Sequence, residues 1–152
     1  MTSPPDSSSI DDPFNLNRFL QAQDDYYEQA LSEISSGRKR THWIWFIFPQ
    51  FQGLTSSFTS TLYSIKSLEE TRAFLAHPVL GIRIIECATV LMRVEGRSAN
   101  EIFGSPDDLK VRSSATLFAS ISPPDSVFER LLEKFYYSER DDKTLELLDS
   151  RT

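Results

Sequence analysis

The chain has 152 residues, enough for one ordinary domain and too few for two. Its net charge of −6 argues against nucleic acid as a partner, because phosphate binding needs a broad basic face and the one dense basic cluster is Arg38-Lys39-Arg40. The hydrophobic fraction of 39% suffices for one core, and the longest nearly uncharged apolar run, residues 43–51, is shorter than the ~20 residues that cross a membrane.

The predicted compartment is the cytoplasm. The chain starts with no basic flank and no apolar run, and no Asn-x-Ser/Thr acceptor for glycosylation occurs. Cys87 is the single cysteine, which suits a reducing compartment. Residues 1–12 are rich in Ser, Pro and Asp and are predicted to form a disordered tail, which leaves residues 13–150 as a single domain.

The first predicted helix starts near Asp12-Pro13, with a capping carboxylate followed by proline, and Gly37 supplies its end. Its apolar face runs from Leu16 to Ile34 at helical spacing. Gln23 falls on the same face. Its amide is therefore expected either to be hydrogen-bonded inside the domain or to line a cleft.

The segment HWIWFIFPQ, residues 42–50, combines two opposing signals. Its aromatic residues and Ile favour a strand, but no second strand-like run is present to pair with it. As a helix capped by Thr41 and ended by Pro49 it is apolar on every side, and such a helix must be enclosed by others. We therefore predict a short central helix.

The rest of the chain is punctuated by further helix signals, with residues 55–65 predicted as loop plus a short helix. Capping boxes begin at Ser67 and Ser98, and Ser105-Pro106-Asp107-Asp108 combines a cap, a proline and two acids. The expected helices end near His77, Gly96, Gly104 and Pro123-Pro124, and apolar spacing indicates two more over residues 127–136 and 144–148. The predicted fold is one all-α multihelical domain of about six to eight helices.

Several mechanisms lack their sequence motifs. The chain has no glycine-rich phosphate loop, no nucleophile elbow and no calcium-loop spacing, and two His with one Cys do not make a zinc site. No metal and no cofactor is expected. Cys87 lies within an apolar helical pattern and is expected to be a structural thiol. His77, which precedes Pro78 between two helices, is expected to cap or pack.

The first candidate site lies at the two ends of HWIWFIFPQ. His42, beside Trp43, could act as a general base or hold a ligand, or it could simply start a helix and bond a nearby carbonyl. Gln50 could present its amide to a ligand or cap a turn.

The second candidate site is the predicted helix within residues 105–118. Asp107, Lys110 and Ser114 fall along one face, and Ser113 and Thr116 adjoin it. A lysine within reach of a serine could promote hydroxyl attack, or the helix start could hold an anion, although its two acids argue against the latter. The structural alternative is an Asp–Lys surface pair with hydroxyls bonded back to the helix backbone.

Five blocks carry a family resemblance: RFLQAQ (18–23), HWIWFIFPQ (42–50), HPVLG (77–81), EIFGSPDDLKVRSSATLF (101–118) and KTLELL (143–148). The chain resembles, from about Asp12 to Leu148, a bacterial and fungal family catalogued as domain of unknown function 1810 and sometimes labelled calpastatin. It departs from the family at Thr55, where a second Gly is usual, and at Ala115, where Met is usual. The resemblance implies a multihelical all-α fold and no particular activity, cofactor or catalytic residue.

These observations favour a small-molecule pocket, with the chain as a cofactor-independent hydrolase or acid–base enzyme on a small, nucleotide-like ligand, or as a binding domain. His42 and Lys110 should then line one cleft within about 10 Å of each other. The alternative is a non-catalytic module that binds a protein or peptide in a groove and shows a contiguous exposed apolar patch. The candidate catalytic residues are His42, Lys110, Ser113 and Ser114, and the candidate ligand-binding residues are Gln23, Trp43, Gln50, Asp107 and Thr116.

Overall fold

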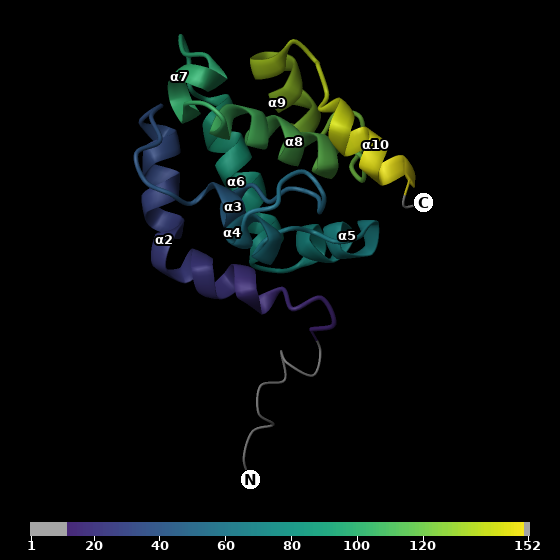
Figure 1. Ribbon diagram of the computed structural model, residues 1–152. Coiled ribbons are helices and arrows are strands. Elements are labelled where there is room, and N and C mark those ends of the chain that lie inside the picture. The colour runs from purple at the N-terminus through teal and green to yellow at the C-terminus, as the bar shows by residue number, and fades with distance from the viewer. Residues whose placement is uncertain (1–11, 151–152) are drawn as a thin grey trace.

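The computed structural model describes residues 12–150, which contain nine helices and no strand (Figure 1). The helices are α2 (Asn17–Ser35), α3 (Ile44–Ile47), α4 (Phe58–Leu62), α5 (Leu68–Ala76), α6 (Leu80–Met92), α7 (Ala99–Phe103), α8 (Asp107–Ala119), α9 (Val127–Tyr136) and α10 (Asp142–Ser150). The predicted all-α class is confirmed. The nine helices of residues 12–150 are one more than the upper end of the expected six to eight, and the short helices α4 and α7 lie where helix signals were predicted. The predicted tail, apart from Asp12, lies outside the described residues.

α2 begins at Asn17, later than the Asp12-Pro13 signal suggests. The Asp12 carboxylate does accept two backbone N–H groups, from Leu16 at 2.7 Å and from Asn17 at 2.9 Å. The residues that follow Asp12, however, form a turn before the helix begins. At the other end Gly37 has a φ of 78°, the left-handed conformation that ends helices. The predicted glycine stop is confirmed.

The segment 42–50 is helical over only four residues, α3, which lies in the middle of the molecule and has three buried residues (Figure 1). The expected Thr41 cap is wrong, because α3 starts after Trp43 and Thr41 donates both its N–H and its hydroxyl to Glu33. Beyond Pro49 the chain is extended and forms an isolated parallel bridge between Phe51 and Ile65. The strand preference of this stretch is thus met by a single bridge.

α8 is a second central helix. It packs against α3, α5, α7, α9 and α10, and residues 113–119 are all buried. The expected cap at Ser105 is wrong: α8 begins after Pro106 without a side-chain cap. The capping box of α7 is complete, since Ser98 accepts the Glu101 N–H and the Glu101 carboxylate accepts the Ser98 N–H.

α5 and α6 meet at a tight corner. Gly81 approaches α5 so closely that a Cβ there would lie 2.0 Å from the Leu75 carbonyl oxygen. No single helix among residues 12–150 is long and apolar enough to cross a membrane. Taken together, α5 and α6 would qualify by length and composition, but the pair is bent by 83°.

Candidate functional site

A buried carboxylate on α2 organises the segment that leads into α3. Glu33 is 7% exposed, and its oxygens accept the N–H groups of Arg40 at 2.7 Å and Thr41 at 3.0 Å and the indole N–H of Trp43 at 2.9 Å. Burial raises the pKa of Glu33, and these hydrogen bonds outweigh that effect and lower the pKa to about 2. The ionised carboxylate therefore holds residues 40–43 and the Trp43 ring in place.

Two lysines share one aspartate on the faces of the two tryptophans. Lys39 Nζ lies 2.8 Å from Asp107 Oδ2, and Lys110 Nζ lies 3.4 Å from Oδ1. Lys39 also lies 5.2 Å from the centre of the Trp43 ring, and Lys110 lies 5.2 Å from the centre of the Trp45 ring. The three charged side chains are only 7–19% exposed. This cluster therefore carries a net positive charge with little water around it.

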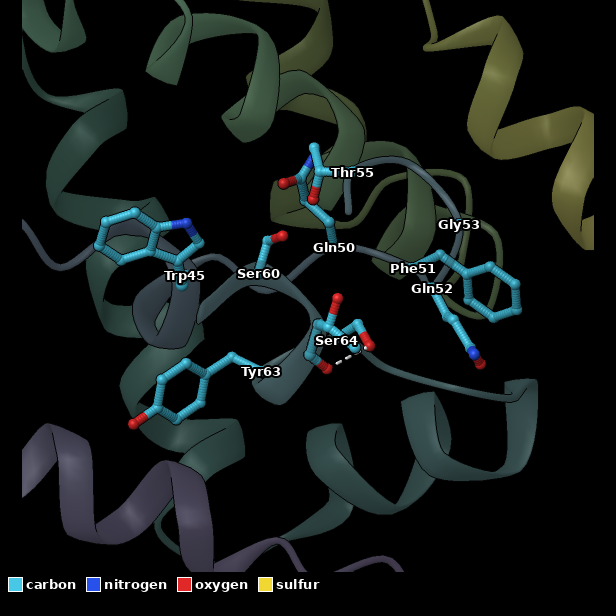
Figure 2. A pocket seen from close by; sticks show the side chains of 10 residues that line it. Trp45, Gln50, Phe51, Gln52, Gly53, Thr55, Ser60, Tyr63 and Ser64 are labelled. Atoms are coloured by element: carbon cyan, nitrogen blue, oxygen red, sulfur yellow. Dashed lines mark hydrogen bonds between the residues drawn. The ribbon is translucent and has the colours of Figure 1, made fainter. Parts of the chain in front are cut away.

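A hollow that we call the Trp45 pocket lies between residues 45–55 and α4 (Figure 2). Its empty space is about 340 Å³, but the centre of a water molecule can reach only about 20 Å³ of it, which is room for about one water. The pocket is lined by Trp45, Gln50, Phe51, Gln52, Gly53, Thr55, Ser60, Thr61, Tyr63 and Ser64.

The hydroxyl groups of the pocket differ in how they are used. Ser60 Oγ donates to the Ser57 carbonyl at 3.0 Å, and Ser64 Oγ donates to the Thr61 carbonyl at 2.8 Å. The Gln50 amide, the Thr55 hydroxyl and the Trp45 indole N–H have no hydrogen-bond partner within residues 12–150. In Figure 2, Gln50 and Thr55 lie together on one side, and the indole nitrogen of Trp45 lies on the side toward Ser60.

The Gln23 amide is hydrogen-bonded inside the domain, the first of the two arrangements expected for it. Its side chain is 1% exposed, its Nε2 donates to the Phe46 carbonyl at 2.7 Å, and its Oε1 accepts a hydrogen bond from Arg83 at 3.3 Å. The amide thus joins α2, α3 and α6 and does not line a cleft.

His42 is exposed, and no hydrogen bond of its imidazole is found in the described part of the chain. Neither His42 nor Lys110 lines the Trp45 pocket. Trp45 is the residue that connects Lys110 to the pocket, because the ammonium group lies over its ring.

Two of the three candidate hydroxyl groups on α8 donate hydrogen bonds to backbone carbonyls of the same helix, as the structural alternative has it. Ser113 Oγ donates to the Leu109 carbonyl at 3.1 Å, and Thr116 Oγ1 donates to the Arg112 carbonyl at 2.8 Å. Ser114 is fully buried, and its hydroxyl has no partner among the described residues. Lys110 is paired with Asp107, which agrees with the structural alternative, and no hydrogen bond joins Lys110 to a serine within residues 12–150.

Glu33, Lys39 and Trp45 contribute to this region although the sequence interpretation did not select them. Glu33 follows Ala30 by three residues on the buried side of α2, so a carboxylate on an apolar stripe was the available signal. Lys39 is the middle residue of an irregular segment, where alternate side chains can point inward and outward.

Fold and site together define a small multihelical domain with a half-buried hollow next to a partly buried pair of lysines. The chain belongs to the family described as protein of unknown function (DUF1810), whose sequence model matches residues 13–148. It is similar to the conserved hypothetical protein Rv1873 from Mycobacterium tuberculosis, a crystal structure with 48% sequence identity and a TM-score of 0.89 that spans 91% of this chain and 99% of that one. No curated protein matches the chain.

Proposed function

We propose that the protein binds a small molecule in the Trp45 pocket. The observation that carries the proposal is the convergence of three polar groups without a protein partner: the Trp45 indole N–H, the Gln50 amide and the Thr55 hydroxyl. Trp45 and Gln50 are half-buried and Thr55 is exposed, so water serves these groups in the free protein and a ligand can replace that water. A ligand would supply the partners.

The surroundings select the class of ligand. The indole N–H can only donate, so the ligand must present an acceptor to it. The rings of Trp45 and Tyr63 form flat walls, and the Tyr63 hydroxyl points away from the hollow (Figure 2). The positive charge of the Lys39–Asp107–Lys110 cluster behind Trp45 favours an anion. A small, planar carboxylate fits these requirements.

Entry of such a ligand requires one wall to move, because the pocket holds about one water as it stands. Gly53 and Thr55 form part of that wall, and the backbone of residues 53–56 belongs to no helix or strand and makes at most one turn hydrogen bond. Segments that make few hydrogen bonds open at low free-energy cost. The wall over residues 53–56 is therefore the expected entrance.

The test is a thermal-shift screen with planar aromatic carboxylates: benzoate, nicotinate and indole-3-carboxylate. At least one compound should raise the melting temperature, because a ligand that binds the folded state stabilises it. Gln50→Leu should abolish the shift. Gln52→Leu is the matched control, since Gln52 also lines the pocket but its amide points away from Gln50 and Trp45 (Figure 2).

Two results count against the proposal. In the first, none of the three carboxylates shifts the melting temperature of the unmodified protein. In the second, the Gln52 variant loses the shift as completely as the Gln50 variant, which would show that the amide facing the hollow has no special role.

A further inference from the structure

α2 and α6 lie side by side and run in the same direction. Tyr27 donates a hydrogen bond to the Glu86 carboxylate near the middle of the two helices. Ten residues further along the chain, just past the end of α2, a Cβ on Gly37 would lie 3.4 Å from Val94 Cγ1 and 3.1 Å from Arg97 Cδ. Both helices therefore lead to the same end of the molecule, where α7 also lies (Figure 1).

A groove that we call the α2–α6 groove follows this contact. The centre of a water molecule can reach about 530 Å³ of it, a volume in the range of small-molecule sites. From Tyr27 to Ser35 it is about 12 Å long at 1.5 Å per helical residue. The groove is lined by Tyr27, Glu28, Leu31, Ser32, Ser35, Glu86, Val90, Arg93 and Val94.

The lining changes character along the groove. Leu31, Val90 and Val94 supply its apolar groups, and Tyr27 with Glu86 forms an acidic, hydrogen-bonded end. Arg93, seven residues after Glu86 on the helix, marks the opposite, basic end. A ligand in the groove would therefore meet a cation at one end and a carboxylate at the other.

Four arginines, Arg38, Arg40, Arg93 and Arg97, form what we call the basic patch at this end. All four are exposed, and neither an ion pair nor a side-chain hydrogen bond is found for any of them in the part of the chain that the structure describes. Arg38 and Arg40 flank Lys39, whose side chain is directed inward to Asp107. Arg97 passes beside Gly37, which brings it to the same loop.

The carboxylates around the basic patch are already bound. Glu33 is buried among backbone N–H groups, Glu95 pairs with Lys134 at 2.6 Å, and Glu101 caps α7 through the Ser98 N–H. The negative ends of the α2 and α6 dipoles favour cations here. That effect does not use the guanidinium donors, however, since none of them bonds a helix-end carbonyl within residues 12–150.

We propose that the α2–α6 groove binds a small organic phosphate, with its phosphate group on Arg93 and the neighbouring arginines and its apolar body over Leu31, Val90 and Val94. Arginine donors match phosphate oxygens in bidentate geometry. A single phosphate suits the patch better than a polymer, because Glu28 and Glu86 lie along the rest of the groove and the chain has a net charge of −6. The site shares no residue with the Trp45 pocket.

The probe is 1-naphthyl phosphate, titrated by isothermal calorimetry at low salt, with inorganic phosphate and 1-naphthol as its two halves. The whole probe should bind more tightly than either half, since each half uses only one end of the contact. The double variant Arg93→Ala/Arg97→Ala should raise its dissociation constant about a hundredfold, at about tenfold for each charged hydrogen-bond donor lost. Val90→Ser should weaken the probe and leave inorganic phosphate unaffected.

The control is the double variant Arg72→Ala/Arg130→Ala, which removes the same charge from two exposed arginines for which no ion pair is found in the described chain. It should leave the dissociation constant nearly unchanged. The proposal is overturned if the control weakens binding as much as the patch variant, if inorganic phosphate binds as tightly as the whole probe, or if the probe does not bind. Co-sedimentation with phosphatidylcholine vesicles containing phosphatidic acid, unaffected by 1-naphthyl phosphate, would also overturn it.

Discussion

Glu33→Gln tests whether one buried carboxylate holds the segment between α2 and α3. The variant keeps the size of the side chain but replaces one accepting oxygen with an N–H₂ group that faces donors. In the unmodified protein the Glu33 oxygens accept from Arg40, Thr41 and Trp43. The amide leaves some of these buried donors without an acceptor, which is costly.

The magnitude follows from the pKa of Glu33, which is about 2 in the folded protein against an ordinary 4.5. A lowered folded-state pKa means that the ionised form stabilises the fold above pH 4.5 and that this stability is lost as the pH falls toward 2. One unit of pKa shift corresponds to about 1.36 kcal/mol, so the ionised Glu33 contributes about 3 kcal/mol to the free energy of unfolding at pH 7. The same relation leaves about 1.4 kcal/mol at pH 3.

The assay is urea unfolding of both proteins at pH 7 and pH 3. The unmodified protein should be more stable than the variant by about 3 kcal/mol at pH 7, and the difference should roughly halve at pH 3. Glu133→Gln is the control, because Glu133 is exposed and no hydrogen bond of its carboxylate is found among the described residues. A difference below about 1 kcal/mol at pH 7, or one that is the same at both pH values, would refute the reasoning.

Three further predictions concern the core. Gly81→Ala should destabilise the fold by about 3 kcal/mol in urea unfolding, because its Cβ would lie 2.0 Å from the Leu75 oxygen and backbone must move; a loss under about 1 kcal/mol contradicts this. Ser114→Ala should stabilise the fold by about 1 kcal/mol in urea unfolding, because it removes a buried hydroxyl with no partner in the described chain. Ser113→Ala is the control and should not stabilise the fold, because the Ser113 hydroxyl is hydrogen-bonded. A Ser114→Ala variant that is less stable than the unmodified protein contradicts this prediction. Cys87 is fully buried, and burial raises its pKa to about 12, so a thiol reagent at pH 8 should label it only on unfolding; rapid labelling of the folded protein contradicts this.

Helix ends that depend on neighbouring residues were predictable from the sequence. The Ser98–Glu101 box, the Gly37 stop and the end of α5 at His77 all appear as expected. Each depends on groups within four residues or on one residue's φ preference, which a sequence shows directly. The all-α class follows from the regular succession of such signals.

The start of α3 was not predictable in the same way. Thr41 has the right chemistry to cap a helix, but Glu33, eight residues earlier and on another helix, binds its N–H and hydroxyl. The Glu33 carboxylate reaches Thr41 only because the chain folds back at this point, and helix-capping patterns in the sequence do not show such a contact. The inward turn of Lys39 has the same origin, because its partner Asp107 lies on α8.

The sequence indicated which residue types belong to a candidate site but not which of them lie together in space. Gln50 lines the Trp45 pocket and Lys110, paired with Asp107, lies over the Trp45 ring, whereas Gln23 belongs to the core. Catalysis by His42, Lys110, Ser113 and Ser114 stays a prediction. The interaction module also stays a prediction. Its expected contact surface is formed by three exposed apolar residues, Val79 just before α6 and Ile82 and Ile85 on α6.

The two proposed sites depend on one local arrangement, the direction of the side chains in Arg38-Lys39-Arg40. Lys39 points inward to Asp107, which also pairs with Lys110 over the Trp45 ring, and the exposed neighbours of Lys39 are left to the basic patch. Glu33 holds this segment through the Arg40 N–H. Under conditions where it stays folded, Glu33→Gln should therefore weaken binding at both sites, whereas Gln50→Leu should affect only the carboxylates and Arg93→Ala/Arg97→Ala only 1-naphthyl phosphate. Loss of both ligands in either of the latter variants would mean that the two sites are one.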